Sequence, residues 1–539
     1  MSQIGKPPCD DALILHGAQA IPCSESSQRW VLAAAIVGSS MAFVDGTVVN
    51  VALPAIQRDL RATAFEMQWV VESYALLLAG LLLVGGSLGD RFGRRRIFAI
   101  GVAVFALASI GCAFAADVGQ LIAARALQGV GAALLVPGSL ALISASFPER
   151  ERGGAIGTWS GFSGITAAVG PVLGGLLVDH YSWVWAFLIN VPLALAVLMI
   201  AWRRVPESRS AAATGGLDLR GALLATVALG GVVYAFIEAP TQHWSAVPVR
   251  TALLAGIAAT VAFVVVEVRT QSPLLPLSLF RNRNFTGANL LTLLLYAALG
   301  GALFFLPLNL IQVQGYAASA AGAALLPFIL IMFVFSRWAG RLVDRFGPKL
   351  PLVAGPMIAA IGFALFALPG VAASAGSYWS SFFPAVVVLG FGMTVTVAPL
   401  TTTVMNSVGS DLSGIASGVN NAVARTAALL AIAVFGMIMA WAFDSRLDEH
   451  LHQAGVSPEV SAFLNSQSSK LAGAEIPPDA NAAVAATLQR VVQLSYVFGF
   501  RWIMLIAAAL ALLSALAASV LIQPKPRAVP SPRVAPAGP

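Results

Sequence analysis

Apolar runs of about 20 residues, separated by short polar segments, recur along almost the whole chain, and such a run is long enough for a helix to cross a bilayer. Gly and Pro occur inside these runs, which membrane helices tolerate because neighbouring helices satisfy the freed backbone groups. The pattern predicts an all-α polytopic membrane protein. We expect fourteen spans, at residues 30–54, 68–89, 97–116, 120–144, 154–178, 184–201, 218–238, 250–268, 285–308, 320–341, 351–369, 379–403, 413–441 and 498–522.

Composition supports this interpretation. The 539 residues are 58% hydrophobic and only 10% charged, and the mean hydropathy is +0.84. The net charge of +7 is explained by basic loops beside a membrane, so nucleic acid is not an expected partner. Three scattered cysteines indicate neither a disulfide framework nor a zinc site. Residues 1–29 lack the pattern of a cleavable signal, and the Pro-rich residues 523–539 are typical of a disordered tail.

The distribution of basic residues predicts the orientation. Of the 31 Lys and Arg residues, 21 lie in the tails and in the loops that follow even-numbered spans, 7 lie on the opposite side, and 3 lie inside spans. Lys and Arg are enriched in cytoplasmic loops. We therefore expect both termini in the cytoplasm and the long loop 442–497 outside, without a separate domain.

One loop motif occurs twice. "GSLGDRFGRRR" begins at Gly86 and "GRLVDRFGPK" begins at Gly340, each at the cytoplasmic end of an even-numbered span. Such a repeat indicates a transporter built from two related halves. The copies lie eight spans apart, so two spans are inserted at the centre. The expected units are a tail at 1–29, an N-terminal six-helix bundle at 30–201, a linker with spans 7 and 8 at 202–268, a C-terminal six-helix bundle at 269–522 and a tail at 523–539.

Five motifs give the chain a strong resemblance to the major facilitator superfamily, and within it to the fourteen-span drug:proton antiporters of the EmrB/QacA type. They are the loop repeat, "VDGTVVNVALP" from Val44, "RALQGVGAA" from Arg125, "VGPVLGG" from Val169 and "PLLPLSLFRNRNF" from Pro273. Three positions depart from the family pattern: Thr166 replaces a Gly, Glu72 replaces a small or hydroxylated residue, and Val184 replaces an Arg between two Trp residues.

The resemblance implies an exporter of amphipathic, often cationic compounds in the inner (plasma) membrane of a bacterium, which works by alternating access. It implies proton coupling and no cofactor. Besides lipid, protons and the small-molecule substrate, a periplasmic adaptor is compatible with this plan, and we expect a monomeric functional unit. Two alternatives remain: a carrier of the same fold for a metabolite, an organic anion or a lipid, and an integral-membrane enzyme. The enzyme is disfavoured because the five His residues lie outside the spans and no catalytic motif is present.

The repeated motif predicts a cytoplasmic gate. Its small residues would let helix ends approach or turn the chain, and Asp90 would accept hydrogen bonds from a neighbouring helix N-terminus. The resemblance implies that this neighbour belongs to the other bundle, near span 13. A phosphate loop is excluded because no Lys-Ser/Thr follows the glycines, whereas a plain basic loop would explain only the arginines. The expected gate residues are Gly86, Asp90, Arg91, Gly93, Arg94, Gly340, Asp344, Arg345 and Gly347.

Charged side chains inside spans are functional candidates, because each costs roughly +2.5 to +3.5 kcal/mol at the centre of a bilayer. Asp45, Glu72 and Arg125 all fall in the outer half of the N-terminal bundle. A carboxylate in a partly dry cavity can carry a proton or pair with a cationic substrate. The alternatives are a structural Asp45–Arg125 ion pair, an Arg125 that donates only to backbone carbonyls, and a Glu72 wetted near the interface.

Further candidates lie in both bundles. Arg425 has no obvious carboxylate partner in its own bundle and would bind Asp45 or an anionic substrate group, and Asn309 and Gln312 would line the cavity. The glycines around Pro171 remove side-chain bulk, so span 5 would pack tightly against a helix of the other bundle and limit leakage. A generic packing motif would look the same. The antiporter motif comprises Gly170, Pro171, Gly174 and Gly175.

Overall fold

The computed structural model describes residues 25–209, 218–270, 273, 275–371, 378–408, 413–478 and 480–524. Within these ranges fourteen helices are long and apolar enough to cross a membrane, and no strand occurs. Each corresponds to one predicted span, so the predicted fold class is confirmed. The predicted tails lie outside the described residues except for residues 25–29 and 523–524.

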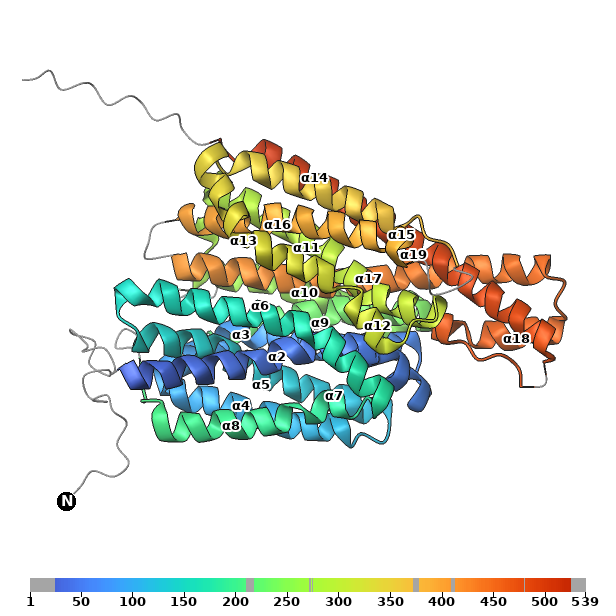
Figure 1. The fold of residues 1–539 in the computed structure, drawn as a ribbon, viewed down its shortest axis with the longest axis horizontal. Coiled ribbons are helices and arrows are strands. Elements are labelled where there is room, and N and C mark those ends of the chain that lie inside the picture. Colours follow the sequence, from blue (N-terminus) through green and yellow to red (C-terminus); the bar gives the residue numbers. More distant parts are fainter. Residues whose placement is uncertain are drawn as a thin grey trace, which may run out of the picture.

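The N-terminal bundle is formed by the first seven helices, in the lower half of Figure 1. α3 and α4 pack on α5, and α2 packs on α6 and α8. Helix starts are set by local caps: Thr63 and Glu66 form a capping box on α3, and Asp117 caps α5. The helices are α2 (Glu25–Asp59), α3 (Ala64–Phe92), α4 (Arg94–Ala113), α5 (Val118–Ser146), α6 (Glu149–His180), α7 (Trp185–Leu188) and α8 (Asn190–Arg204).

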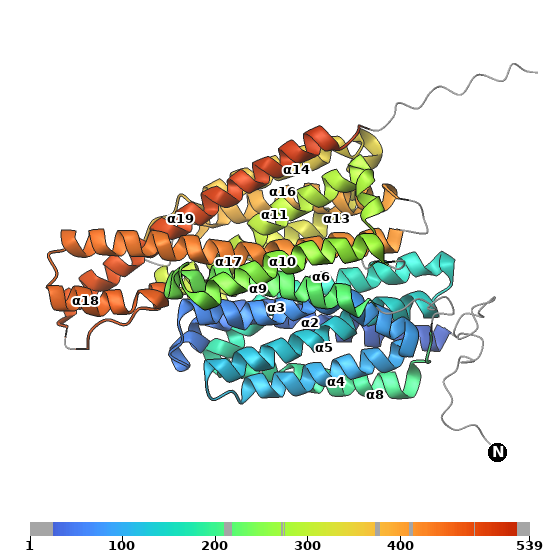
Figure 2. The same ribbon diagram turned by 180° about the vertical axis from the view of Figure 1, so that it is seen from behind.

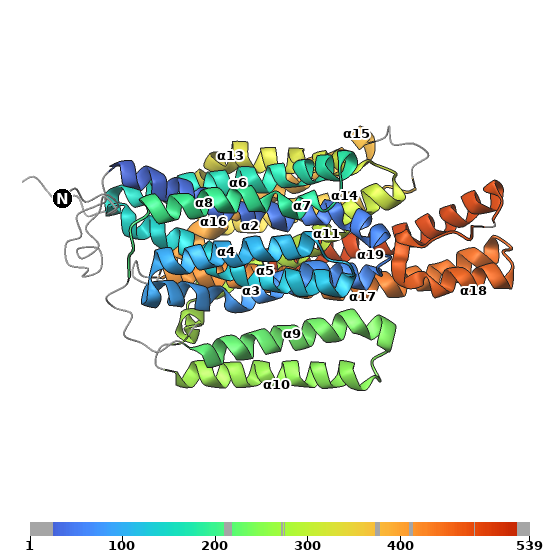
Figure 3. The same ribbon diagram turned by 90° about the horizontal axis from the view of Figure 1, so that it is seen from below.

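Spans 7 and 8 form a hairpin of α9 (Leu219–Gln242) and α10 (Val247–Arg269), which lies beside the two bundles (Figure 3). Gly231 and Gly256 allow its two helices to touch, because a Cβ on either would collide with the other helix. α9 packs on α3 and α17, whereas many large side chains of α10 are exposed. The hairpin is thus attached to the body mainly through α9.

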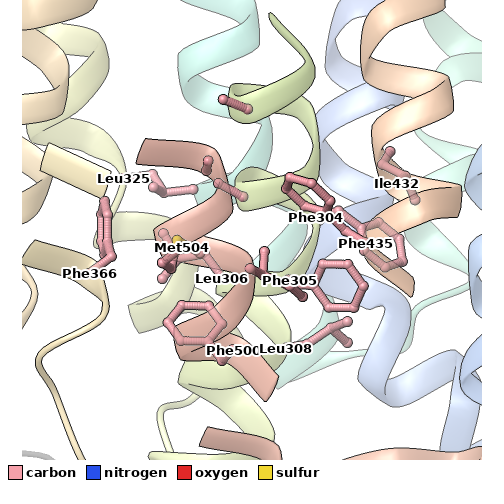
Figure 4. Close-up of a cluster of buried hydrophobic side chains, with 14 of the residues drawn as sticks. Phe304, Phe305, Leu306, Leu308, Leu325, Phe366, Ile432, Phe435, Phe500 and Met504 are labelled. Carbon is pink, nitrogen blue, oxygen red and sulfur yellow. The ribbon is translucent and has the colours of Figure 1, made fainter. Parts of the chain in front are cut away.

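The C-terminal bundle fills the upper half of Figure 1. Its core contains the aromatic cluster of Figure 4, in which Phe304, Phe305, Phe435 and Phe500 are all at most 2% exposed. The elements are η1 (Leu277–Arg281), α11 (Arg283–Leu308), the π-helix η2 (Asn309–Val313), α12 (Ala318–Ala323), α13 (Leu326–Phe346), α14 (Lys349–Phe366), α15 (Tyr378–Ser381), α16 (Phe383–Asn406), α17 (Ser413–Gln453) and α19 (Ala482–Leu521).

The segment expected as a long loop at 442–497 is largely helical, which corrects the predicted boundaries of spans 13 and 14. α17 and α19 continue beyond the bundle and are joined by α18 (Pro458–Ser466) and the 3-10 helix η5 (Ser468–Gly473), as Figure 2 shows. Phe443, Leu447 and Leu451 recur every four residues on α17 and are buried in this extension. Polar residues between these positions lower the mean hydropathy, so a hydropathy criterion does not detect this part of the helix.

The two ends of the molecule differ. The basic end is the end where α2 begins and α19 ends, and it carries Arg94, Arg95, Arg96, Arg203, Arg204 and Arg345. The distal end carries the extension of α17, α18 and α19. A Cβ added to Gly153, Gly157 or Gly161 in the basic half of α6, or to Gly340 on α13, would meet no atom within 4 Å. The distal halves of the bundles, by contrast, are in direct contact.

Candidate functional site

Asp45 lies at the centre of a fully buried polar network in the N-terminal bundle. Nη1 of Arg125 lies 2.5 Å from Oδ2 of Asp45, and both side chains are at most 1% exposed. Nε2 of Gln128 donates to Oδ1 at 2.7 Å, and Nδ2 of Asn190 donates to the same oxygen at 3.2 Å. Helices α2, α5 and α8 therefore converge on one carboxylate.

Further contacts hold Arg125 in place. Its Nη1 donates to Oε1 of Gln128 at 2.7 Å, and its Nε donates to the carbonyl of Val70 at 3.0 Å. Its guanidinium lies 4.3 Å from the ring centre of Tyr74. Burial of a charge is costly unless an opposite charge and hydrogen bonds replace its contacts with water. The structure supplies these, so the two structural alternatives, the Asp45–Arg125 ion pair and the backbone contact of Arg125, exist together.

Sequence reasoning missed three members of this network, Gln128, Asn190 and Ser109. Gln128 stands three residues after Arg125 inside the quoted motif, which places both side chains on one face of α5. That spacing could have indicated it. Asn190 begins α8 after an apolar stretch, and Ser109 of α4 accepts from Gln128 at 2.8 Å. A single polar residue in an apolar run gives no indication of its partner.

Glu72 is in a different situation. It is 0% exposed, and neither of its carboxylate oxygens has a hydrogen-bond partner in the part of the chain that the structure describes. The expected alternative of a wetted side chain is therefore wrong for this structure. The helical spacing places Glu72 on the same face of α3 as Phe65, Trp69, Leu76 and Ala79. This face packs on α9 and α17. We call this junction of α3, α9 and α17 the seam.

An uncompensated ion in such a place is far more costly than a neutral carboxyl group, because nothing there replaces the lost hydration. Asp45 accepts three hydrogen bonds, one of them from its cationic partner Arg125, whereas Glu72 accepts none from the described residues. Of the two carboxyl groups, Glu72 is therefore the one suited to hold a proton in this conformation. A movement of α17 relative to α3 would change the surroundings of Glu72 and leave those of Asp45, which lies within one bundle, unchanged.

The antiporter motif lies at the distal contact between the bundles. Cβ atoms on Gly170 and Gly174 would collide with Thr47 and Val48 of α2. A Cβ on Gly175 would collide with Ala318 and Ser319 of α12, and one on Gly322 of α12 would collide with the carbonyl of Pro171. The expected tight packing against a helix of the other bundle is therefore present. Its small residues allow two backbones to touch.

Polar groups reinforce the distal contact. Asp179 at the end of α6 accepts from the backbone nitrogens of Ala318 and Ser319 at 3.0 and 2.8 Å, which places a carboxylate at the start of α12. Gln312 donates to Oε1 of Gln57 at 2.8 Å, and Gln57 donates to the carbonyl of Lys470 in η5 at 3.2 Å. The distal end is thus closed by α2, α6, η2, α12 and η5.

The three residues expected to share a cavity are not brought together. Gln312 belongs to the distal closure, and Asn309 is 1% exposed and accepts from Gln314 at 3.3 Å. Asp45 is paired inside its own bundle, so the expected bond from Arg425 to Asp45 is absent. Arg425 is half-buried on α17 and has no hydrogen bond or ion pair with any described residue.

The loop motif at the basic end makes contacts within its own bundle. Asp90 forms an ion pair with Arg94 at 2.7 Å. The first turn of α4 is capped by Glu207, whose oxygens accept from the backbone nitrogens of Arg95 and Arg96 at 3.0 and 3.2 Å. The hydrogen bonds expected from a helix N-terminus of the other bundle to Asp90 are not formed by any described residue. Residues 409–412, which precede α17, lie outside the described residues.

The glycines of the motif divide into two kinds. Gly93 and Gly347 have φ values of 114° and 75°, so the expected chain turns are confirmed. A Cβ on Gly86 would make only an ordinary contact with Pro137, and one on Gly340 would meet nothing. The expected close approach at these two positions is absent because the basic halves stand apart. Arg91, Asp344 and Arg345 are all exposed at least in part.

Two helix bundles, an inserted hairpin and buried charges in the membrane-spanning part define a polytopic transporter. The sequence profile of the Major Facilitator Superfamily matches residues 35–433. The chain belongs to this superfamily.

Relatives and solved structures agree with this assignment. The chain is 33% identical to the tetracenomycin C resistance and export protein of Streptomyces glaucescens over 90% of both chains. It is 35% identical to the multidrug resistance protein Stp of Mycobacterium tuberculosis over 80% of both. Among solved structures, a bacterial homolog to the human lysosomal transporter Spinster, in an inward-facing and unoccupied conformation, is similar with a TM-score of 0.62 at 18% identity. That alignment covers 92% of this chain and 98% of the other.

Proposed function

We propose that the protein is a proton-driven exporter of amphipathic, often cationic compounds in a bacterial plasma membrane, with its basic end in the cytoplasm. The names of the relatives, which are resistance and export proteins, support the class of cargo. The excess of Lys and Arg at the basic end supports the orientation. With this orientation the structure is open to the cytoplasm and closed outside.

The observation that carries the proposal is the contrast between two buried carboxyl groups. Asp45 is fixed by Arg125, whereas Glu72 has no partner at a contact between the two bundles. When the bundles rock, the seam opens and Glu72 meets water, so it can release a proton on one side and take one up on the other. Proton movement and rocking are thereby linked.

The repeated loop motif completes the cycle. In the cytoplasm-open state Asp90 pairs with Arg94 within its own loop. Closure of the basic end would bring Gly86, Gly340 and Asp90 against the opposite bundle, where the small residues allow helix ends to meet. The motif acts as the cytoplasmic gate in this scheme, and the glycines around Pro171 act as the outer seal.

The test uses everted vesicles from a host that lacks its own pumps. A panel of cationic dyes and antibiotics is offered with and without a proton gradient, beside vesicles with Glu72→Gln. We expect uptake that collapses with the gradient, proton release when a substrate is added, and loss of both in the variant. Gradient-independent uptake, or no proton release with any compound, would contradict the proposal.

A second candidate is export of an anionic compound, favoured by Arg425. Its guanidinium has no ionic partner among the described residues. An anionic substrate group would supply one. Arg425→Gln is expected to reduce transport of anionic compounds and to leave transport of cationic ones unchanged. The opposite pattern would remove this candidate.

A further inference from the structure

A cavity of about 490 Å³ lies between the inserted hairpin and the two bundles, away from the Asp45 network. Its walls come from α3, α9, α10, α11 and α17 and from the 3-10 helix η1. It lies in the half nearer the basic end, because Ala222, Thr286 and Val419 are all close to the starts of helices that begin there. The hairpin thus forms one wall of a partly open cavity.

The lining is apolar and neutral. None of the described residues that line the cavity is charged, and most are aliphatic or aromatic, among them Leu229, Phe263, Phe280, Leu293 and Val423. Small-molecule sites typically have volumes of about 300–1,000 Å³ and combine apolar walls with a few convergent polar groups. This cavity has such a volume and such walls. It offers no carboxylate to a cationic compound.

Two polar groups in the lining remain available. Thr260 and Thr286 donate to the carbonyls of Gly256 and Phe280. Thr426 on α17 instead has no hydrogen bond with any described residue, although a helical Thr commonly bonds the carbonyl three or four residues before it. Nδ2 of Asn289 donates to the carbonyl of Phe285 at 2.9 Å, which leaves its second N–H unused. Donors from α11 and α17 therefore face one apolar space.

We propose that this cavity binds one uncharged amphipathic small molecule, which enters from the cytoplasmic leaflet. The hydrocarbon part would lie against α9 and α10, and an acceptor oxygen would take hydrogen bonds from Thr426 and Asn289. The outer face of α9 carries the exposed residues Leu223 and Val227, so lipid lies directly behind this wall. An acyl chain would use the walls but not the donors, and a cation would find no counter-charge.

The site goes beyond the proposed export function, and its occupancy is measured without transport. The probe is benzophenone, a neutral aromatic ketone that cross-links on illumination, applied to the full-length protein in liposomes. We expect saturable cross-linking within α9 and α17, mapped by mass spectrometry. Fluorenone should compete better than fluorene, the hydrocarbon of similar shape, by roughly three- to tenfold, because only the ketone accepts a hydrogen bond.

Three variants test the assignment. Ala225→Trp fills the cavity and should abolish the saturable cross-link, whereas Leu223→Trp, on the lipid-facing side of the same helix, should retain it. Thr426→Val keeps the shape of the side chain and should remove the preference for fluorenone. Unfolding of each variant in detergent shows whether the fold is intact, and the Thr426→Val comparison remains decisive if Ala225→Trp does not fold.

Cross-linking that does not saturate, or that survives Ala225→Trp in a folded protein, would overturn the site. Equal competition by fluorene and fluorenone would overturn the amphipathic ligand in favour of an acyl chain. Glu72→Gln separates this inference from the export function, because that variant should lose proton-driven transport and keep the cross-link.

Discussion

The N-terminal bundle contains two buried carboxyl groups with opposite surroundings. Around Asp45, four side chains from α5, α4 and α8 and the Tyr74 ring form a network in which the charges are paired and the carboxylate accepts three hydrogen bonds. Around Glu72, the α3 face packs on α9 and α17 with apolar side chains, and the carboxyl group has no partner. One site is built within a bundle, and the other lies between moving parts.

This difference indicates different roles: the surroundings of Asp45 hold a charge in place, whereas those of Glu72 allow a proton to be exchanged. In the ion pair of Asp45 and Arg125, removal of either charge is costly because it would leave the remaining partner buried and unpaired. A carboxyl group without a partner responds to whatever reaches it, which includes water, a proton or a cation. The location of Glu72 at the seam makes its surroundings depend on the position of α17 relative to α3.

The largest expected effect is on stability, from breaking the Asp45 pair. Arg125→Leu leaves a buried carboxylate without its cation and should lower the free energy of unfolding by about 3–5 kcal/mol. The double variant Asp45→Asn with Arg125→Leu removes both charges and should recover much of this loss. Unfolding in detergent micelles measures both. A double variant less stable than Arg125→Leu would show that the charge pair is not the source of the loss.

Glu72→Gln should have a large effect on transport and little on folding. The two side chains have nearly the same shape, and neither gains a partner, so the free energy of unfolding should change by less than about 1 kcal/mol. Proton-linked uptake should disappear because the amide cannot exchange a proton. The measurement is proton release from vesicles over a range of pH. Unchanged release in the variant would assign coupling to another group.

Sequence patterns predicted the fold and the chemical types at the site, and they did so for physical reasons. Hydropathy over about 20 residues identifies a span. Asp45, Glu72 and Arg125 are functional candidates because they are charged residues inside spans, whichever way their side chains point. The spacing from Arg125 could have indicated Gln128, but Asn190 and Ser109 could not be predicted because they join the Asp45 network only after three helices pack. The extension of α17 and α19 was not predicted as helical because its polar residues lower the mean hydropathy. Its buried positions nevertheless recur at helical spacing.

The state of the transporter was likewise beyond sequence reasoning. Gly86 and Gly340 carry the same motif whether the basic end is open or closed, so no pattern shows that Gly340 faces open space. Asn309 and Gln312 are both polar residues in an apolar run, yet one is buried with Gln314 and the other joins the distal closure. Neither periodicity nor composition distinguishes these places.

A smaller effect is expected from a neutral member of the Asp45 network. Gln128→Leu removes the donor to Asp45 and leaves Arg125 and Ser109 each without one partner. A hydrogen bond to a charged group is worth about 1.5–3 kcal/mol, so the free energy of unfolding should fall by an amount in that range. Unfolding in detergent micelles measures it. A loss near zero would mean that the ion pair alone maintains the network.

The smallest effect is expected when a glutamine at the seam, Gln68, is replaced by leucine. Here the free energy of unfolding should not fall. Gln68 is 1% exposed, its Oε1 has no hydrogen-bond partner, and its amide packs against Gly436 of α17. Gln68→Leu replaces an unsatisfied buried polar group by an apolar one of similar length, which should be neutral or raise the free energy of unfolding by up to about 1 kcal/mol. Gln128→Leu in the same bundle is the matched control, since both glutamines are buried on membrane helices. If both variants lose the same stability, the seam is as well satisfied as the Asp45 network, and Glu72 loses its distinction as the group free to exchange a proton.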